Sequence, residues 1–503
     1  MTNPSLAGQS TFRVTTLAVV MGALLLTGCA VTPEPLSGTL TPQDLAAERG
    51  AMYQNQEPLA GPLTLDEALA RAVKYNLEHR VKLLEEAVAR DQLDVANFGL
   101  LPKLTAAAGY TSRDNELGSS SQDLATGAQS LVPSTSTDRS RGTADLTLSW
   151  NLLDFGVSYY QAKQQADRVL AAQERRRKVV QQLMLQVRRA YWQAAGAQAL
   201  QDSIKPILEQ ADAALKDSRK IESERLRSPL ESLTYQRQLL DLVTQLEDIQ
   251  TELSQAQPRL AALINLEPGK SFQLAVPTEL RTPVVNLPLE KMEEVALQRR
   301  PDLMEARYIE RIGVNETRRA MASLFPGLEF SIGAHRDNNS FLVNNSWRDA
   351  GVRVSWNLFN LLSAGSIRRA ADNQLAVARE QHLALNMAVL SQVHIAYREF
   401  LGRQRQFELS TTLNRVDQDV LKHTRNAAQS SAQGKLQEIR ASASAAMSTL
   451  RLYDRYSNLQ SAYGQVLATL GLDPLPDEMR SHDLAAVKEG IRSMEATWVR
   501  NLQ

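Results

Sequence analysis

Residues that could carry out catalysis or bind a cofactor are scattered along this sequence rather than grouped. The segment Glu267–Ser271 reads EPGKS, like the end of a phosphate-binding loop, but Ile264 stands where such a loop needs its first glycine. The segment also follows a predicted helix, whereas a phosphate-binding loop follows a strand. No Gly-x-Ser-x-Gly nucleophile motif occurs. We expect no enzyme, no cofactor and no metal site, since metal-ligand spacing is absent among His79, His335, His382, His394, His423 and His482.

One residue whose surroundings do imply chemistry is Cys29, the single cysteine. It follows a positive charge at Arg13 and an apolar run from Val14 to Leu26, which is too short for a stable transmembrane anchor and is typical of a secretory signal peptide. The residues Leu-Thr-Gly-Cys that end at Cys29 resemble the bacterial lipobox. This resemblance implies that a lipoprotein signal peptide, residues 1–28, is removed and that the Cys29 thiol is acylated, as by palmitate. The alternative is a small buried cysteine inside an ordinary signal peptide.

The residue after Cys29 indicates where an acylated chain would go. Ala30 stands in place of the aspartate that retains many lipoproteins of Gram-negative bacteria at the inner membrane. We therefore expect the mature chain at the outer membrane of a Gram-negative bacterium. It has no second cysteine, so an intrachain disulfide is excluded despite the oxidising periplasm.

The composition favours long helices over several globular domains. The chain is rich in Ala, Gln, Leu, Arg and Glu, and only 5% of its 503 residues are aromatic. It carries 56 basic and 56 acidic side chains, and this balance argues against a nucleic-acid partner, which requires an excess of positive charge. No long apolar segment follows Cys29, so any membrane crossing must be made by strands.

The dominant feature is an internal repeat, which predicts two similar halves. Early in each half the matching segments, LTLD with LPLE and LLPKL with LFPGL, are offset by 224 residues. Later matches, such as Trp150 with Trp356 and Tyr191 with Tyr397, are offset by 206, because the first half contains a longer loop. We predict an extended N-terminal arm with at most a short helix (30–62), a first repeat (63–269), a linker (270–286), a second repeat (287–474) and a C-terminal tail (475–503).

Apolar residues at three- and four-residue steps predict helices at both ends of each repeat. Each repeat opens with one helix, in the first repeat from Leu65 to about Phe98. Each ends in a helical hairpin, at 156–267 and at 364–472. The apolar face of the opening helix comprises Leu65, Leu69, Val73, Leu84 and Val88.

The hairpins are long and have recognisable turns. An arm of about 65 residues is ~100 Å of helix, and Pro206 is expected to kink the arm that contains it. The first hairpin is expected to turn near Glu222–Ser228, because Ser228, Pro229 and Glu231 form a helix-start signal. The second is expected to turn near Gln433–Gly434.

Between the opening helix and the hairpin the apolar period changes to two, which predicts strand pairs at 103–152 and 327–358. Strands of about ten residues with one apolar and one polar face are typical of membrane barrels. The alternative is a soluble antiparallel sheet packed on a helix. The loops predicted at Thr111–Gly142 and His335–Ala350 are polar. The apolar face comprises Leu104, Ala106, Ala108, Tyr110, Leu146, Leu148, Trp150, Leu152, Leu328, Phe330, Ile332, Val352, Val354, Trp356 and Leu358.

Four such strands cannot close around a pore on their own. Lipid tolerates no open sheet edge, because each unpaired backbone group there costs several kcal/mol. Three chains would supply about twelve strands, enough for a water-filled interior. The predicted fold is therefore mainly α-helical with a membrane β-barrel: long helical hairpins form a periplasmic tube, and four strands per protomer contribute to a 12-stranded trimeric barrel.

Three pairs of segments occur once in each repeat: LTLDEALARAVKYN and LPLEKMEEVALQRRPDL, LLPKL and LFPGL, and the two SWNL strand exits into long helices. Together they resemble the TolC-type outer-membrane factor (outer membrane efflux protein) family over about residues 63–475. The resemblance implies a homotrimeric channel-tunnel, a passive exit duct served by a periplasmic adaptor (membrane fusion) protein and an inner-membrane transporter. With its lipobox the chain resembles the lipidated branch, which implies efflux of small molecules. The alternatives are type I secretion of a protein or peptide and, more distantly, a lipid-anchored structural coiled coil.

In that family the tips of the helical hairpins close the periplasmic mouth, often with acidic rings, and contact the adaptor. The family's acidic pattern is absent from the second tip, which reads GKLQEIRASASA from Gly434. The alternative reading is that the charged tip residues are solvated turn residues. The resemblance places the gate or adaptor-docking positions at Glu222, Glu224, Arg225, Ser228 and Glu231 in the first tip and at Gly434, Gln437 and Glu438 in the second.

Overall fold

The computed structural model describes residues 41–224, 228–277, 279–427, 432–476 and 483–502. They fall into two units that divide between Gln54 and Asn55. The first unit contains α2 (Pro42–Met52), in which Thr41 and Asp44 form a reciprocal capping box. The predicted signal peptide and Cys29 lie outside the described residues.

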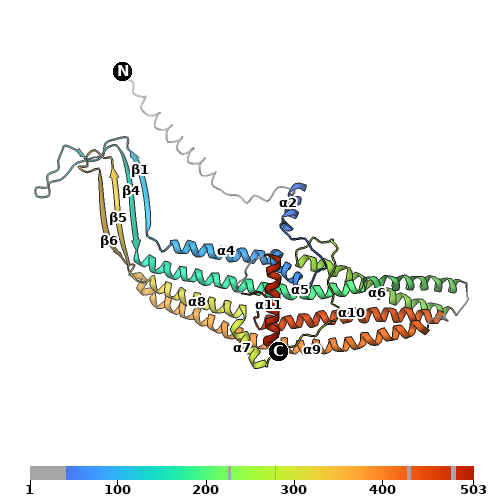
Figure 1. Ribbon diagram of the computed structural model, residues 1–503. Helices are drawn as coiled ribbons and strands as arrows, with labels where there is room; N and C mark the ends of the chain where they lie inside the picture. The colour runs from blue at the N-terminus through green and yellow to red at the C-terminus, as the bar shows by residue number, and fades with distance from the viewer. Residues whose placement is uncertain (1–40, 225–227, 278, 428–431, 477–482, 503) are drawn as a thin grey trace, which may run out of the picture. The chain divides into compact units, whose positions relative to one another are not determined.

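The second unit contains the same set of elements twice, as the repeat predicts (Figure 1). Most of its described residues are helical, and its four long strands form one sheet, so the predicted mainly α-helical fold with four strands per chain is confirmed. The first set is α3 (Leu65–Tyr75), α4 (Leu77–Phe98), β1 (Lys103–Ser112), β4 (Ser140–Asn151), α5 (Leu152–Ser223) and α6 (Pro229–Leu263). The second set is α7 (Leu289–Arg299), α8 (Pro301–Ala322), β5 (Gly327–Asp337), β6 (Ser346–Ser355), α9 (Phe359–Ala427) and α10 (Ala432–Thr469). The remaining elements are α11 (Leu484–Leu502) and the short pair β2 (Gly118–Ser119) and β3 (Ser134–Thr135).

The prediction of a single helix at the start of each repeat is wrong, because each repeat begins with two consecutive helices. In the first repeat Asn76 is extended (φ −61°, ψ 127°), and its side-chain oxygen accepts a hydrogen bond from the His79 backbone N–H at 3.1 Å, which caps α4. In the second repeat Arg300 is also extended, because Pro301 disfavours a helical residue before it. A break of one residue leaves the apolar spacing nearly unchanged, so periodicity does not reveal it.

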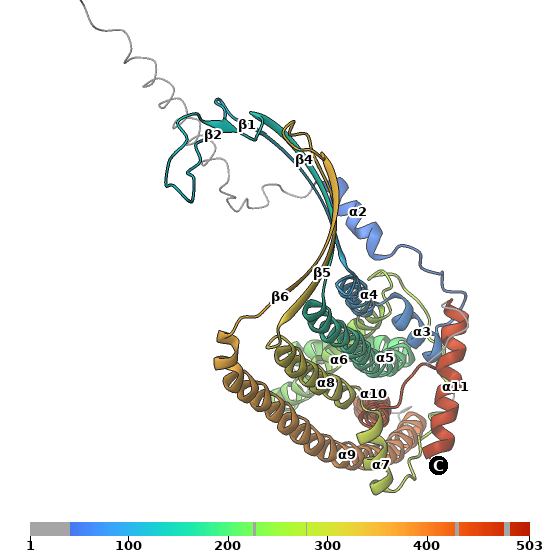
Figure 2. The same cartoon turned by 90° about the vertical axis from the view of Figure 1, so that its left-hand side faces the viewer.

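The sheet has the order β1-β4-β5-β6, and each neighbouring pair is antiparallel. β1 and β6 are its edges, and Figure 2 shows that the strands curve along their length. The two repeats meet at β4 and β5, where Leu148 lies opposite Ile332 and Trp150 lies opposite Phe330. The strand pairs of the two repeats therefore build one continuous surface.

The strands extend further than the polarity of their ends predicts. The loop predicted at His335–Ala350 is wrong for much of its length, because β5 continues to Asp337 and β6 begins at Ser346. His335 and Trp347, which the sequence analysis assigns to a loop, are paired strand residues. A strand face that contacts water carries polar side chains, so polarity alone does not separate such a strand from a loop.

Two very long helices continue from the ends of β4 and β6. α5 has 72 residues, about 108 Å of helix, and it continues on both sides of Pro206, so the proline does not end it. α5 packs against α4, α6, α8 and α10, while α9 packs against α8 and α10. Within the described part of the chain, no helix contains a stretch both long and apolar enough to cross a membrane.

A hydrophobic core joins elements from both repeats. Tyr191 of α5, Phe400 of α9 and Leu459 of α10 are almost completely buried in it. Trp192 lies edge-on to both Tyr191 and Tyr456, with ring centroids 5.3 and 4.6 Å away. Burial raises the pKa of Tyr191 to about 12. The Tyr191–Trp192 pair is therefore a packing feature.

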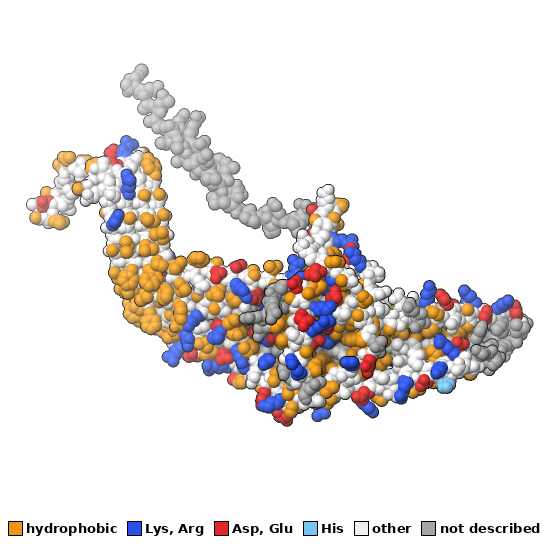
Figure 3. Space-filling model, viewed as in Figure 1, with side chains coloured by type: hydrophobic (Ala, Val, Ile, Leu, Met, Phe, Trp, Pro, Cys, Tyr) orange, Lys and Arg blue, Asp and Glu red, His pale blue; other side chains and the backbone are white. Residues whose placement is uncertain are grey.

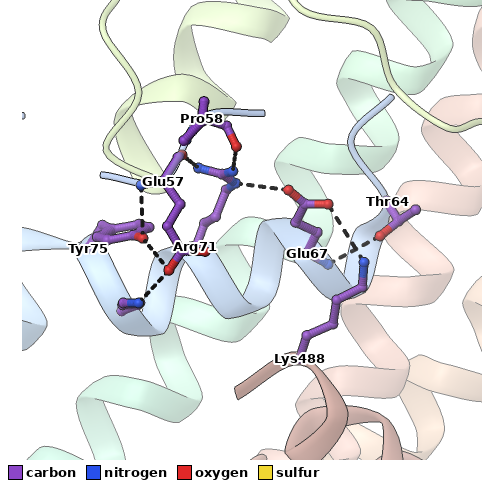
Figure 4. A network of polar contacts seen from close by, with 8 residues as sticks. Glu57, Pro58, Thr64, Glu67, Arg71, Tyr75 and Lys488 are labelled. Carbon is purple, nitrogen blue, oxygen red and sulfur yellow. Dashed lines mark hydrogen bonds and ion pairs between the residues drawn. The ribbon is translucent and has the colours of Figure 1, made fainter. Parts of the chain in front are cut away.

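Arg71 joins α3 to the residues that precede it (Figure 4). Its side chain is buried, yet it donates to the backbone carbonyls of Glu57 at 2.8 Å and Pro58 at 3.0 Å and pairs with Glu67 at 3.1 Å. Lys488 of α11 lies 3.6 Å from the same Glu67 carboxylate. A buried guanidinium needs such partners, so this network fixes the course of the chain into α3.

The residues predicted to be a C-terminal tail include the helix α11, which packs on α3. Ile491 and Trp498 of α11 are buried, and Arg492 forms an ion pair with Asp66 at 2.6 Å. The helix is thus held by contacts with a segment more than 400 residues earlier, which local sequence does not reveal.

Candidate functional site

One face of the sheet is covered with exposed apolar side chains. Strand pairing aligns Leu104, Leu148, Ile332 and Ala350 in one row across the sheet. Leu104 and Ile332 are 66% and 62% exposed. Figure 3 shows orange side chains covering the strands. The register also places on this face Ala106, Leu146, Trp150, Leu328, Phe330, Ala334, Val352 and Val354.

Aromatic side chains gather where β4 and β6 lead into helices. Trp150 lies edge-on to Phe155, with centroids 5.7 Å apart, and Phe155 is followed by Tyr159 at 6.5 Å. The Trp356 indole Nε1 donates to the Leu324 carbonyl at 3.0 Å. Amphipathic aromatic rings favour membrane–water boundaries, so this end of the sheet has the chemistry of such a boundary.

The opposite face is polar and carries a cluster that the sequence analysis missed. His335 lies between carboxylates from two other strands: its Nδ1 is 2.7 Å from Asp145 Oδ1, and its Nε2 is 3.2 Å from Asp349 Oδ1. Trp347 stacks on the imidazole, with centroids 5.3 Å apart. Both ring nitrogens can donate only when the imidazole is protonated. The His335 ring thus links β4, β5 and β6, and it can donate to both carboxylates when it is protonated.

Gly333 provides the space for this bridge. A Cβ at Gly333 would overlap both the His335 ring and the Asp349 carboxylate. In the sequence, Gly333 and His335 alternate with apolar residues, and this pattern predicts that they share one face of the strand. Their approach to Asp145 depends on pairing between the two repeats, which the sequence does not specify.

Hydrogen bonds also join the loops at the end of the sheet away from the helices. The Asn338 side-chain oxygen accepts from the Gly142 backbone N–H at 2.7 Å. The Ser340 hydroxyl donates to Asp138 at 2.8 Å, and hydrogen bonds from the Ser340 backbone and side chain hold the pKa of Asp138 below its usual value. The loops of the two repeats are thus fastened to each other.

The first helical hairpin turns where the sequence predicts. α5 ends at Ser223, and α6 begins at Pro229 directly after Ser228. The half-buried Glu222 accepts a hydrogen bond from Gln236 Nε2 at 2.6 Å, which joins the two arms near the turn. Of the other predicted positions, Glu224, Ser228 and Glu231 are exposed, and Arg225 lies outside the described residues.

The second hairpin turns earlier than predicted. α9 ends at Ala427 and α10 begins at Ala432, so the turn predicted at Gln433–Gly434 is wrong, and both residues lie in the first turn of α10. A glycine in a helix costs only about 1 kcal/mol relative to alanine, so Gly434 need not mark the turn. Glu438 pairs with Arg425 of α9 at 3.7 Å.

The structure brings the two predicted tips together. Arg440 of α10 donates to the Gln238 side chain of α6, which connects the hairpins just behind their turns. Gln437, one of the predicted positions, is exposed beside this connection. Apolar residues at three- and four-residue steps hold the helices together behind it. They include Ile204, Ile207 and Ala211 of α5, Leu239, Leu242 and Leu246 of α6, and Ile439, Ala443 and Ala446 of α10.

α4 carries an exposed apolar stripe. Leu84 and Val88, predicted on the apolar face of the opening helix, are 67% and 53% exposed, and Val95 and Phe98 are even more so. Together with Leu77 and Val81, they follow the heptad spacing of a helix–helix seam, in steps of four and three residues apart from one step of seven between Val88 and Val95. The pattern is that of a packing face, and in a single chain it is open to solvent.

Comparison with known proteins shows which family part of the chain resembles. The model of the outer membrane efflux protein family matches residues 71–266, most of the first repeat. This segment of the chain is therefore similar to the outer membrane efflux protein family. Proteins of that family are channels and not enzymes.

Solved structures share the fold of this chain along most of its length. A membrane protein from Pseudomonas aeruginosa has a TM-score of 0.63 at 18% identity and covers 83% of this chain and 96% of its own. The outer-membrane channel OprN has a TM-score of 0.61 at 18% identity, and the match covers 88% of this chain and 99% of that one. The CmeC outer membrane channel of Campylobacter jejuni has a TM-score of 0.62 at 12% identity, and the match covers 94% of this chain and 95% of that one. No curated protein sequence matches the chain significantly.

Proposed function

We propose that three copies of this chain form the outer-membrane channel-tunnel of a tripartite export system. The four-stranded sheets join into a 12-stranded barrel, with the apolar face toward lipid and the His335 face toward the interior. The helical hairpins continue the passage into the periplasm. The channel is a passive exit duct for small molecules, and the family's efflux role favours this substrate class over secreted proteins.

The observation that carries the proposal is the incomplete sheet. β1 and β6 have no further long strand beside them among the described residues, and the face between them exposes large apolar side chains such as Leu104 and Val352. In lipid, the edges of such a sheet must pair with strands of other chains. Pairing of β6 with β1 of the next copy removes all edges at once.

The stripe on α4 supports the same assembly. A heptad seam that includes Leu84 and Phe98 gains stability when another helix covers it, at roughly 25 cal/mol per Å² of buried apolar surface. A ring of copies would cover it in every protomer. We therefore place α4 at the contact between neighbouring protomers.

Mass measurement of the detergent-extracted particle tests this proposal. We expect three chains per particle and discrete conductance steps when the particle is added to a planar bilayer. A stable monomer, or a trimer that never conducts ions, would refute the channel.

We further propose that the hairpin tips form the periplasmic gate and the adaptor-docking surface. Exposed carboxylates at Glu224 and Glu231, together with the pair of Glu438 and Arg425, supply the polar chemistry for a second protein. Deletion of Gly434–Glu438 should abolish export while trimers persist in the outer membrane. Loss of the trimer itself would show that the tip is scaffold rather than a docking surface.

The partners of the duct are a periplasmic adaptor and an inner-membrane transporter that supplies the energy. We also infer that Cys29 carries the lipid of the mature chain, because the four residues ending there match a lipobox. Acylation would add a second anchor to the barrel.

A further inference from the structure

Two arginines interrupt the apolar face of the sheet toward its end away from the helices. Arg348 of β6 lies opposite Ala334, and Arg336 of β5 lies opposite Ala144. Residues opposite each other share a face, so both arginines lie on the face that carries Ile332. Both arginines are exposed.

The arginines are close together at the border of the apolar rows. They occupy diagonal positions on neighbouring strands, a Cα separation of roughly 7–8 Å. Arg336 is six residues beyond Phe330, about 20 Å along the strand. Tyr110, 73% exposed, lies one row beyond Arg336 on the same face. Figure 3 shows blue side chains on this part of the strands, beyond the dense orange band.

Their positive charge is not neutralised on that face. The nearest strand carboxylates face the other way: Asp145 and Asp349 bind His335, and Asp337 pairs with Arg141 at 3.0 Å. The described residues supply no carboxylate within ion-pairing distance of either Arg336 or Arg348. Two guanidinium groups therefore extend together from a surface that is otherwise apolar or uncharged.

Such a pair fits an anion held beside an apolar surface. An unpaired charge within hydrocarbon is costly, so arginines near the end of a membrane strand extend toward the headgroups. Guanidinium groups bind phosphate through paired hydrogen bonds. We propose that Arg336 and Arg348 together bind a phosphate of an outer-leaflet lipid of the lipid A type, whose acyl chains lie on the apolar face that carries Ile332 and Leu148.

This assignment rests on the proposed trimeric barrel and adds a consequence to it. Arg348 lies on the edge strand β6, which would pair with β1 of the next copy. Each lipid would then sit beside a seam between protomers, and its acyl chains would cover both sides. Bound lipid should therefore stabilise the trimer against dissociation.

Lipid binding to the full-length trimer tests the inference. The protein in detergent is titrated with bisphosphorylated lipid A in mixed micelles, and bound lipid is counted by native mass spectrometry. We expect the R336A/R348A double variant to bind roughly 30-fold more weakly or worse, and its trimer to lose the lipid-dependent gain in dissociation temperature. R336K/R348K, which keeps charge but loses paired hydrogen bonds, should fall between.

Three comparisons determine the result. R353A is the matched control, because Arg353 is an exposed arginine of the same strand on the opposite face, and it should bind like the wild type. Dephosphorylated lipid A and inorganic phosphate should each fail to reproduce the stabilisation. Equal binding by R336A/R348A, or by dephosphorylated lipid, in a conducting wild-type trimer would overturn this inference alone. A monomeric wild type would overturn the proposed function, and this inference with it.

Discussion

Positions 265 and 471 are equivalent in the two repeats, yet they impose different demands on the residue. Both end a long helix in the left-handed conformation, with φ of +57° at Asn265 and +69° at Gly471. Asparagine tolerates this conformation. A Cβ at Gly471, however, would lie 2.5 Å from the carbonyl carbon of Arg299 and 2.6 Å from its oxygen. Backbone atoms cannot rotate away, so only glycine fits there.

Gly471→Ala should therefore destabilise the protein by about 3 kcal/mol, the sum of left-handed strain and a backbone clash. The measurement is the urea midpoint of unfolding in detergent. Gly269→Ala is the control, because Gly269 has φ +92° but open space around its Cβ position, and it should cost only about 1 kcal/mol. Equal effects of the two changes would contradict the clash.

His79 shows a second difference between equivalent positions, since the second repeat has the buried Leu303 in its place. Burial lowers the pKa of His79, a hydrogen bond to the Val73 carbonyl at 2.6 Å opposes that shift, and Arg176 reinforces it. Below pH ~6.5 the unfolded chain therefore binds a proton more readily than the folded chain. Stability from neutral His79 is present above that pH and is lost as the pH falls through the folded-state pKa.

His79→Leu should reduce the acid sensitivity of the fold. The wild type is expected to lose more stability between pH ~7.5 and pH ~5 than the variant, because the variant has no buried imidazole to protonate. Thermal unfolding at both pH values measures the difference. An unchanged pH dependence would mean that His79 is solvated in the working assembly.

At the scale of elements, the same heptad pattern has different outcomes on different helices. In α5, α6 and α10 the stepped apolar residues, such as Ile204, Leu242 and Ile439, meet one another and form a core. In α4 the equivalent steps remain exposed, as do the edge strands β1 and β6 of the sheet. Periodicity identifies a packing face without identifying what covers it.

Leu84→Glu with Val88→Glu should break the trimer without unfolding the chain. Both side chains are exposed in a single chain, so charges there are tolerated until another protomer covers them. Burial of two unpaired carboxylates would weaken association by at least about a hundredfold. Light scattering measures the particle mass. Leu124→Glu, at a fully exposed loop leucine, should keep the trimer; a trimer in the double variant would exclude α4 from the contact.

At the scale of the whole molecule, the two similar halves together form one continuous sheet and a set of packed helices. Each half supplies two strands and one hairpin, and the β4–β5 pairing joins them. The halves differ in the length of their strand-connecting loops, and the helix α11 packs on α3 of the first half. In the proposed assembly, lipid at Cys29 and the shared barrel are independent anchors.

Cys29→Ser should therefore remove the acyl chain and leave the protein in the outer membrane, with at least part of its export activity. Membrane fractionation and the intact mass of the purified chain provide the measurement. The matched reference is the wild type, whose mass should exceed that of its processed polypeptide by the lipid. An entirely soluble variant would show that the strands do not insert.

Local periodicity and turn chemistry were enough to predict the repeat, the long hairpins, the position of the first tip and the common face of the apolar strand residues. The breaks at Asn76 and Arg300, the turn before Gly434 and the helix α11 depended on caps and distant contacts. Only the pairing of β4 with β5 and of β5 with β6 brought His335 between two aspartates and set Arg336 beside Arg348. Strand alternation gives the face of each residue, whereas the tertiary register decides its neighbours, because register depends on partners far away in the chain.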